Sequence, residues 1–496
     1  METATFSYCF SSEQINYRGM PNQYRFGKYY ISIDSRTPYC VSKKQCCECA
    51  ILGYAVDVIT AKCDSLPEDI LMNCNSIDEV IEYEKKLGGK YIIFYNNKEE
   101  YYILGDATAS IPLFYALTGN VVCTNNLQII AKKFDLSPNS QYLKIRHNGD
   151  ISQAMPYDIT VYEEIKQLLP NHYYDVNKAK AIRFVNSAVK QHELSPEEAT
   201  DKVLPMIDVL VRYYQNNFKI NCPITSGRDS RVVLAFLLAN GFDGSCYTIK
   251  HPEHFDTTQD IVVPRKLCKS VGVPYSLIQD VELTPCVIDQ MDDCFGKGNY
   301  SMRTLRIAQT VKEYCEDSAI INGDIIGQVG KCSLHRDIPS CFATPGYFRC
   351  KLHNYSHEAK EQLDLWLSEI KQSGEKVNTF DLFSIENRMG RWAAQSNMVY
   401  NALGQISLNI FNSRSIIYVW TAVRRRLRKR SLLHIGLINY KMSALLDVPF
   451  EKDKGLIIKL SKANGICYLV ASYLKYNIEK LLFFRKKKLD AMNKKG

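Results

Sequence analysis

The 496-residue sequence lacks a long hydrophobic run, a secretory leader and a short internal repeat. No stretch approaches the roughly 18 consecutive apolar residues of a membrane-spanning helix. Residues 1–6 carry neither the basic start nor the apolar core of a signal peptide. Low-complexity tracts are also missing, which argues against a disordered chain or a solenoid. These absences, with 46% hydrophobic residues, predict a globular cytoplasmic protein.

Charge and cysteine content give further information about the partners and the redox environment of the protein. The formal net charge is +9, and much of the excess lies in two short basic runs, residues 424–430 and 485–488. We therefore expect local basic faces and no nucleic-acid partner. Eighteen cysteines without a leader indicate reduced thiols more than a disulfide framework. The tight cluster Cys40, Cys46, Cys47 and Cys49 has no second ligand set at matching spacing, so buried thiols are favoured over zinc.

A chain of this length is expected to form two or three domains. Residues 1–190 alternate apolar and polar in short runs, which predicts a largely β domain. Its clearest segment is residues 87–106, two strands joined by a turn at Asn96–Asn97. Strands alternate with longer helical segments over residues 195–440, which predicts parallel βαβ units. We expect strands at residues 245–250, 273–278 and 319–324, and helices that start at residues 195–198 and 256–258. Residues 441–496 are expected to form a basic helical tail that either docks on its own domain or contacts a membrane surface.

The loop Thr225–Arg231 is the most informative stretch of the second domain. It follows an apolar strand-like segment and precedes a helix-period pattern that stops at Gly241. Backbone N–H groups and the helix dipole favour anions at such a position, and Gly227 permits close approach. The spacing alone fits a phosphate cradle and an ordinary capped turn about equally well.

The sequence Thr-Ser-Gly-Arg-Asp-Ser-Arg of this loop resembles the pyrophosphate-binding loop of the asparagine synthetase family, Ser-Gly-Gly-x-Asp-Ser. The resemblance implies that ATP binds with its phosphates on the loop and that Mg²⁺ binds Asp229. Residues 322–331 occupy the place of that family's acidic loop, and Asp324 matches its first acid. The second acid falls on Gly327 or Gln328, and the alternative is a plain glycine-rich turn with one exposed aspartate.

Ligands collect beyond the carboxyl ends of parallel strands, so these loops are expected to line one crevice. Later arginines are candidate clamps for carboxylate or phosphate, although ion pairing with Glu386 on a helix surface is equally compatible with the pattern. The candidate nucleotide-binding residues are Thr225, Ser226, Gly227, Arg228, Asp229, Ser230, Arg231, Ile249 and Gly323. The candidate catalytic residues are Asp324, Arg388, Arg391 and Arg414, and the candidate metal ligands are Asp229 and Asp324.

Residues 87–115 and 165–174 resemble the N-terminal glutaminase-type domain of the same family, departing from it at Gly105, Ser110 and Asn171. The implied fold is an Ntn-like β-sandwich of α+β type, followed by a parallel α/β ATP-pyrophosphatase (PP-loop) domain. A working glutaminase of that family uses an N-terminal cysteine as nucleophile. Here position 2 is Glu2 and the first cysteine is Cys9, so we expect no glutamine hydrolysis.

The resemblance, which covers about residues 85–415, implies an ATP-dependent amide-forming ligase. A substrate carboxylate would attack ATP, giving an acyl-adenylate and pyrophosphate, and ammonia or a substrate amine would then displace AMP. Small-molecule or glycan-precursor carboxylates and amines are the implied substrates. The alternative is a nucleotide-binding scaffold without turnover, favoured by the missing second acid and by a catalytic lysine that we do not find in the sequence.

Overall fold

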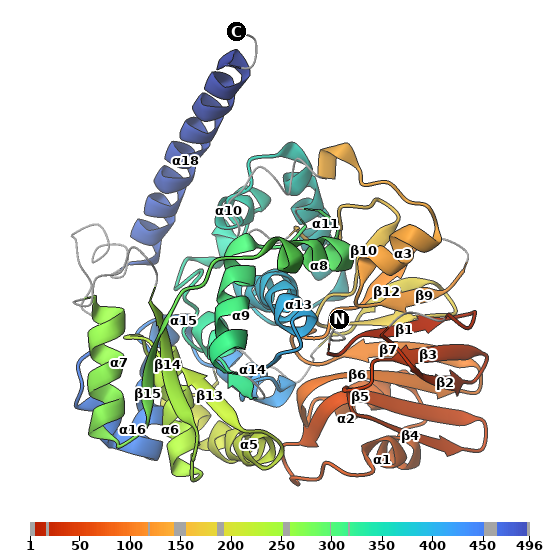
Figure 1. The fold of residues 1–496 in the computed structure, drawn as a ribbon, viewed down its shortest axis with the longest axis horizontal. Coiled ribbons are helices and arrows are strands. Elements are labelled where there is room, and N and C mark those ends of the chain that lie inside the picture. Colours follow the sequence, from red (N-terminus) through yellow and green to blue (C-terminus); the bar gives the residue numbers. More distant parts are fainter. Residues whose placement is uncertain are drawn as a thin grey trace.

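The computed structural model describes residues 5–15, 19–117, 120–142, 155–185, 193–250, 258–297, 299–315, 318–450 and 464–493. Within these ranges the chain forms two antiparallel sheets and one parallel sheet, with helices around and between them (Figure 1). The antiparallel sheets come from residues 8–183 and the parallel sheet from residues 220–408. The predicted combination of a β-rich part and a parallel α/β part is thus confirmed at this coarse level.

The two antiparallel sheets pack face to face. The first has the order β10-β8-β9-β1-β3-β2 and the second β12-β11-β7-β6-β5-β4. Residues from both sheets, among them Phe10 and Phe94, fill the space between them, with ring centroids 5.7 Å apart. The first sheet contains β1 (Tyr8–Ser11), β2 (Asn22–Phe26), β3 (Tyr29–Ile33), β8 (Phe114–Ala116), β9 (Val122–Thr124) and β10 (Ile165–Gln167). The second contains β4 (Tyr39–Lys44), β5 (Cys47–Asp57), β6 (Leu87–Asn97), β7 (Glu100–Gly105), β11 (His172–Asp175) and β12 (Lys180–Arg183).

Short helices cover the outer faces of this sandwich. Helices α1 (Leu66–Asn73) and α2 (Ile77–Glu84) bury their apolar residues against the second sheet, and α3 (Leu127–Lys133) packs on the first. Asn171 stands where the resemblance has glycine, and its φ of 63° lies in the left-handed region that asparagine tolerates better than most residues. This departure is therefore compatible with the same backbone turn.

The hairpin β6–β7 was predicted with the wrong turn. Asn97 pairs with Glu100, so the turn residues are Lys98 and Glu99, both with positive φ. Asn96 instead accepts a hydrogen bond from the Glu99 N–H on its side-chain oxygen at 3.0 Å. Asn96, which suggested a turn, thus lies in strand β6 and stabilises the turn through its side chain.

The parallel sheet has the order β15-β14-β13-β16-β17. Its strands are β13 (Ile220–Pro223), β14 (Ser245–Lys250), β15 (Tyr275–Gln279), β16 (Ala319–Ile321) and β17 (Ile406–Leu408). The first four coincide with predicted strands, and Pro223 ends β13. The chain adds β14 and β15 on one side of β13 and β16 on the other, so its winding direction changes between β13 and β16. Ligand crevices in open α/β sheets form at such a switch point.

Helices α5 (Pro196–Asn217), α6 (Asp229–Ala239), α7 (Gln259–Ser270) and α16 (Leu432–Met442) lie along this sheet (Figure 1). The predicted start of α5 is a capping box between Ser195 and Glu198. Thr258 is the residue before α7, while Asp256 and Thr257 of the predicted cap lie outside the described residues. The remaining helices are α8 (Pro285–Phe295), α9 (Met302–Tyr314), η1 (Ile326–Gly330), η2 (Ser340–Phe342), α10 (Pro345–Lys351), α11 (His357–Ser373), α12 (Thr379–Leu382), η3 (Phe383–Ala393), α13 (Ala394–Ala402), α14 (Arg414–Thr421), α15 (Arg425–Arg428), η4 (Ser443–Leu446) and α18 (Gly465–Asn493).

Buried polar contacts join the sandwich to the second half of the chain. Glu386 of η3 accepts two hydrogen bonds from Arg183, both 2.7 Å, one from Asn171 at 2.9 Å and one from the Trp366 indole at 2.7 Å. Apolar residues of the first half, such as Val56, also belong to the core of the second. Glu386 therefore does not pair with the later arginines on a helix surface, the alternative that the sequence suggested.

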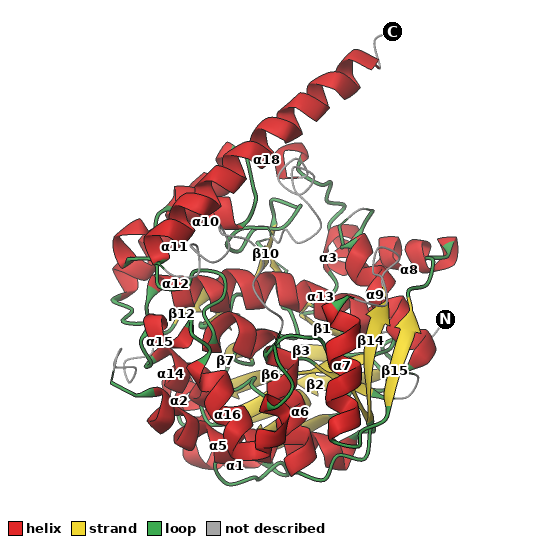
Figure 2. Ribbon diagram, turned by 90° about the vertical axis from the view of Figure 1, so that its left-hand side faces the viewer, coloured by secondary structure: helices red, strands yellow, loops and turns green. Residues whose placement is uncertain are grey.

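The C-terminal helix α18 packs with its first turns near α10 and then projects from the body (Figures 1 and 2). Tyr476 is buried against this region and Phe483 contacts Tyr355. In the part of the chain that the structure describes, the helices are too short or too polar to cross a bilayer.

Candidate active site at the carboxyl ends of the parallel strands

The loop after β13 and the loop after β16 are in direct contact. A Cβ atom built on Gly323 would lie 3.0 Å from the Asp229 carbonyl carbon, and one on Gly327 would lie 2.6 Å from Asp229 Oδ2. Position 327 therefore has no room for the second family acid while Asp229 keeps its place. The contact brings Asp229 and Asp324, from loops almost a hundred residues apart, together at the carboxyl ends of β13 and β16, beside the cavity that Asp324 lines. We call this region the crevice.

Asp229 begins α6 and is partly exposed. The Nε2–H of buried His434, on α16, donates to Asp229 Oδ1 at 2.8 Å. Burial alone would raise the pKa of Asp229, but the hydrogen bond from His434 and the charges of Lys331 and Arg228 lower it below its usual value. Burial also lowers the pKa of His434, so the imidazole is neutral at physiological pH. Asp229 is thus a fixed, ionised carboxylate.

Asp324 has a pKa that is displaced in the opposite direction to that of Asp229. Its side chain is exposed within the crevice, yet the surrounding protein reduces its hydration, and Asp229 repels its charge. These two effects raise the pKa of Asp324 to about 6, against the opposing attraction of Arg388. Two neighbouring carboxyl groups with pKa values displaced in opposite directions are typical of functional sites.

Positive charge surrounds this pair. Arg228, Lys331 and Arg388 are close enough to act on one or the other carboxylate, and burial lowers the pKa of Arg388 to about 10 and also lowers that of Lys331. Lys331 and His434 were not among the predicted site residues. Lys331 ends the glycine-rich stretch that contains Asp324, which is a usable sequence signal, whereas His434 lies on a distant helix without any motif.

The loop itself is held by internal hydrogen bonds. Ser226 donates its N–H and its hydroxyl to Asp260 Oδ1, at 3.0 and 2.6 Å. The Thr225 N–H donates to Ser230 Oγ at 3.2 Å, and the Gly227 N–H donates to Thr225 Oγ1 at 3.2 Å. Three backbone donors of the expected phosphate cradle therefore have protein acceptors. Ile249, also expected here, is half-buried at the carboxyl end of β14 and packs with Tyr247 and Ile278.

Arg231 points away from the crevice, contrary to the expectation. Its guanidinium is fully buried and donates to the Leu445 and Val448 carbonyl oxygens at 2.9 and 2.5 Å. It also stacks on Phe450, 4.1 Å from the ring centre, with Arg228 at 4.4 Å from the same ring. Arg231 therefore fixes the segment after α16 to α6.

Arg391 and Arg414 also use their donors inside the protein. Arg391 donates to the Met155 and Ile159 carbonyl oxygens and to Gln167 Oε1. Arg414 pairs with buried Glu84 and donates to Asn171 Oδ1 at 2.8 Å. Both arginines connect the second half of the chain to the sandwich. Of the three late arginines, Arg388 alone acts on Asp324 among the described residues.

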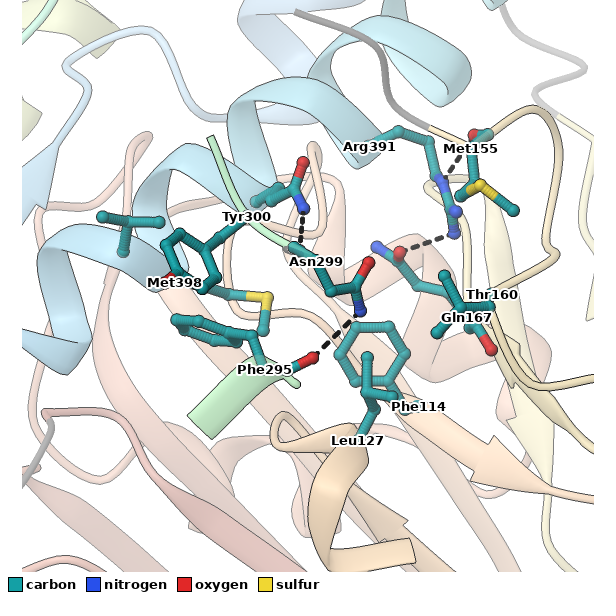
Figure 3. Close-up of a pocket in the computed structure, with 13 residues that line it drawn as sticks. Phe114, Leu127, Met155, Thr160, Gln167, Phe295, Asn299, Tyr300, Arg391 and Met398 are labelled. Atoms are coloured by element: carbon teal, nitrogen blue, oxygen red, sulfur yellow. Dashed lines mark hydrogen bonds between the residues drawn. The ribbon is translucent and has the colours of Figure 1, made fainter. Parts of the chain in front are cut away.

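Among the cavities near the seam between the halves, one is lined by Asp324 and another by Arg391. Beside Asp324, a polar cavity is lined by Lys90 and Ser110 from the sandwich and by Asn322 and Asn409 from the second half. A second, more apolar cavity has Arg391 on its edge and about 520 Å³ of space, part of it open to solvent (Figure 3). Its apolar lining consists of Phe114, Leu127, Met155, Val161, Phe295, Tyr300, Met398 and Val399.

Cys9, the first cysteine, lies inside the sandwich. It is fully buried, and burial raises its pKa to about 12, so it is a poor nucleophile. All eighteen cysteines are free thiols. In the early cluster Cys49 is buried and Cys47 partly so, but Cys40 and Cys46 are exposed, so the expectation of buried thiols was wrong for these two. Among the described residues, no three histidine, cysteine or acidic side chains meet in a group that could hold a metal ion.

No protein-family model and no curated protein matches this sequence. Among solved structures, glutamine phosphoribosylpyrophosphate amidotransferase from B. subtilis, complexed with ADP and GMP, aligns at 13% identity with a TM-score of 0.21. The alignment covers 62% of this chain and 64% of that enzyme. The chain thus spans less than two thirds of that enzyme's length, and so low a TM-score carries no argument about fold or function. The likeness to asparagine synthetases rests on the sequence motifs alone.

Proposed function

We propose that the protein is an ATP-dependent ligase that forms an amide through an acyl-adenylate. The proposal depends on one observation above all. Asp229 and Asp324 interact at the switch point of the parallel sheet, and Arg228, Lys331 and Arg388 act on one or the other of them. Basic side chains can bind phosphate oxygens, and carboxylates can bind a divalent metal ion. This mixture of side chains therefore suits a polyanion bound together with a metal ion better than an anion alone.

The residues present fit Mg²⁺ bound jointly with phosphate. Two carboxylates are too few for a protein-only site, but Mg²⁺ commonly takes one or two carboxylates, several waters and substrate phosphate oxygens. Asp229 and Asp324 would hold it, and the ion would neutralise phosphate charge when bound. Ionised Asp229 is suited to this at neutral pH, and Asp324 becomes suited to it above about pH 6.

The remaining side chains would position and neutralise the reactants. Arg228 and Lys331 lie near the start of α6, where they would attract the triphosphate. Arg388 would hold the substrate carboxylate as it attacks the α-phosphorus and pyrophosphate leaves. The amine would then attack the acyl carbon and AMP would leave, with catalysis due mainly to positioning and charge stabilisation. Without a nucleophilic terminal cysteine, ammonia or a substrate amine would supply the nitrogen.

A scaffold without turnover is the second candidate, and a specific contact favours it. Asp260 already accepts the two Ser226 donors that a phosphate would need, and Gly327 leaves no space for a second family acid. A carboxylate inside an anion cradle opposes phosphate binding unless α7 moves.

Pyrophosphate release separates the two functions. We would incubate the protein with ATP, magnesium, ammonia and a pooled set of carboxylates, and measure pyrophosphate and ATP binding in parallel. The ligase predicts release that depends on the carboxylate pool and that Asp229→Ala abolishes. Asp364→Ala, which changes an exposed aspartate of α11, is the matched control and should retain full release. ATP binding without release would establish the scaffold, and ATP binding unaffected by Asp229→Ala would refute this crevice as the site.

A further inference from the structure

Helix α18 has two apolar faces, and the body of the protein covers one of them. The covered face includes Leu469, Tyr476 and Phe483, which contact the region of α10 and Tyr355. Ser472 and Glu479 add polar contacts on the same side, to Lys351 and His353. This docking sets the direction of the helix, which then runs outward from the body (Figure 2).

The opposite face is exposed and apolar. Ile466, Val470, Leu474 and Ile478 follow one another at intervals of four residues, and Leu481 and Phe484 continue the stripe. Side chains at this spacing share one side of a helix. Leu481 is 71% exposed and Ile478 is 57% exposed, values unusual for large aliphatic residues in a row. The stripe therefore has no cover within the described chain.

Basic residues flank the stripe toward the outer end of the helix. Lys475 and Arg485 are exposed, and residues 475–488 contain six lysines and arginines against one glutamate. A second copy of the helix would bring two such positive segments together, which is unfavourable. An anionic lipid surface offers the complementary charge and an apolar layer below it.

We propose that α18 lies on the surface of an anionic bilayer through the Ile466–Phe484 stripe, with its basic residues at the lipid headgroups. The helix is too polar to span a bilayer, so the contact is interfacial. Because the inner face of α18 stays on α10, the body and its crevice would be held beside the membrane. The inference does not depend on the proposed ligase activity.

Vesicle sedimentation of the full chain tests this contact. We expect binding to vesicles of equimolar phosphatidylserine and phosphatidylcholine, little binding to pure phosphatidylcholine, and a loss of binding as salt increases. The double variant Ile478→Glu and Leu481→Glu should reduce the bound fraction at least about tenfold, because each removes an apolar side chain from the contact. Met72→Glu, at a residue 58% exposed on α1, is the matched control and should bind like the unmodified protein.

Each remaining outcome overturns the proposal. Equal binding by the double variant would show that the stripe is not the contact. Failure of the unmodified protein to bind anionic vesicles, together with a dimer that the same substitutions dissociate, would assign the stripe to a second copy. Failure to bind with a monomeric protein would exclude both lipid and self-association. Because both changed residues are exposed, the thermal unfolding midpoint should stay constant and confirm that the fold is intact.

Discussion

Lys90 provides a direct test of how burial between the two halves changes the pKa of a side chain and, through it, the stability of the protein. Its ammonium is buried between the sandwich and the second half, where it donates to Asn401 Oδ1 at 3.0 Å and the Ser407 carbonyl oxygen at 3.3 Å. Burial lowers the pKa of Lys90 from 10.5 to about 7, and the attraction of Asp106 opposes this only in part. The unfolded chain keeps the ordinary value, so between about pH 7 and 10.5 it binds more protons than the folded protein.

The free energy of unfolding must therefore rise with pH in this interval. The slope for one proton is about 1.4 kcal/mol per pH unit, which amounts to roughly 5 kcal/mol over the whole interval. Lys90→Met removes the titrating group and with it this slope. The lost hydrogen bonds contribute an offset that does not change with pH.

Urea unfolding of both proteins at several pH values measures the effect. The difference in free energy, variant minus unmodified protein, should fall by about 1.4 kcal/mol for each pH unit above about pH 7. Subtracting the two curves removes the other tyrosines and cysteines, which titrate in both. Lys371→Met, at an exposed lysine of α11, is the matched control for the removal of a lysine. A flat difference for Lys90→Met would refute the burial argument.

Two further substitutions test the interface and the crevice. Arg414→Met leaves its buried glutamate partner uncompensated and should lower the free energy of unfolding by about 3–5 kcal/mol, whereas Lys360→Met in an exposed pair should change it by less than about 1 kcal/mol. Equal effects in urea unfolding would contradict the assignment of Arg414. Gly327→Ala puts a Cβ 2.6 Å from the Asp229 carboxylate and should reduce pyrophosphate release by on the order of tenfold or more. Gly105→Ala, whose nearest contact is 3.6 Å, should leave release unchanged, and an equal loss would implicate general unfolding.

The sequence was informative wherever a local pattern determines structure. Apolar runs between turn residues identified β13 to β16, and Pro196 with the acidic residues after it identified the start of α5. The strand order then places the loops after β13 and β16 at one edge, as the motifs had suggested. Strand β17 was missed because its three residues, Ile-Ser-Leu, are interrupted by a polar residue and form no continuous apolar run as those of β16 do.

The direction in which a long side chain points could not be predicted from the sequence. Arg228 and Arg231 are three residues apart on one helix start, yet Arg228 acts on Asp229 while Arg231 turns into the core. That difference depends on carbonyl groups contributed by η4 and Val448, more than two hundred residues later. His434 contacts Asp229 across a similar separation in sequence, so no local pattern could have predicted this hydrogen bond.

The carboxylate of Glu386 has a mechanical consequence. Arg183 and Asn171 on one side of the seam and Trp366 on the other all donate to this single buried group. Separating the two parts would remove the Arg183 and Asn171 donors from the buried Glu386 carboxylate, which would cost several kcal/mol. We therefore expect the two parts to move together as one rigid unit, so that a ligand at the seam would meet cavity walls that are already in place.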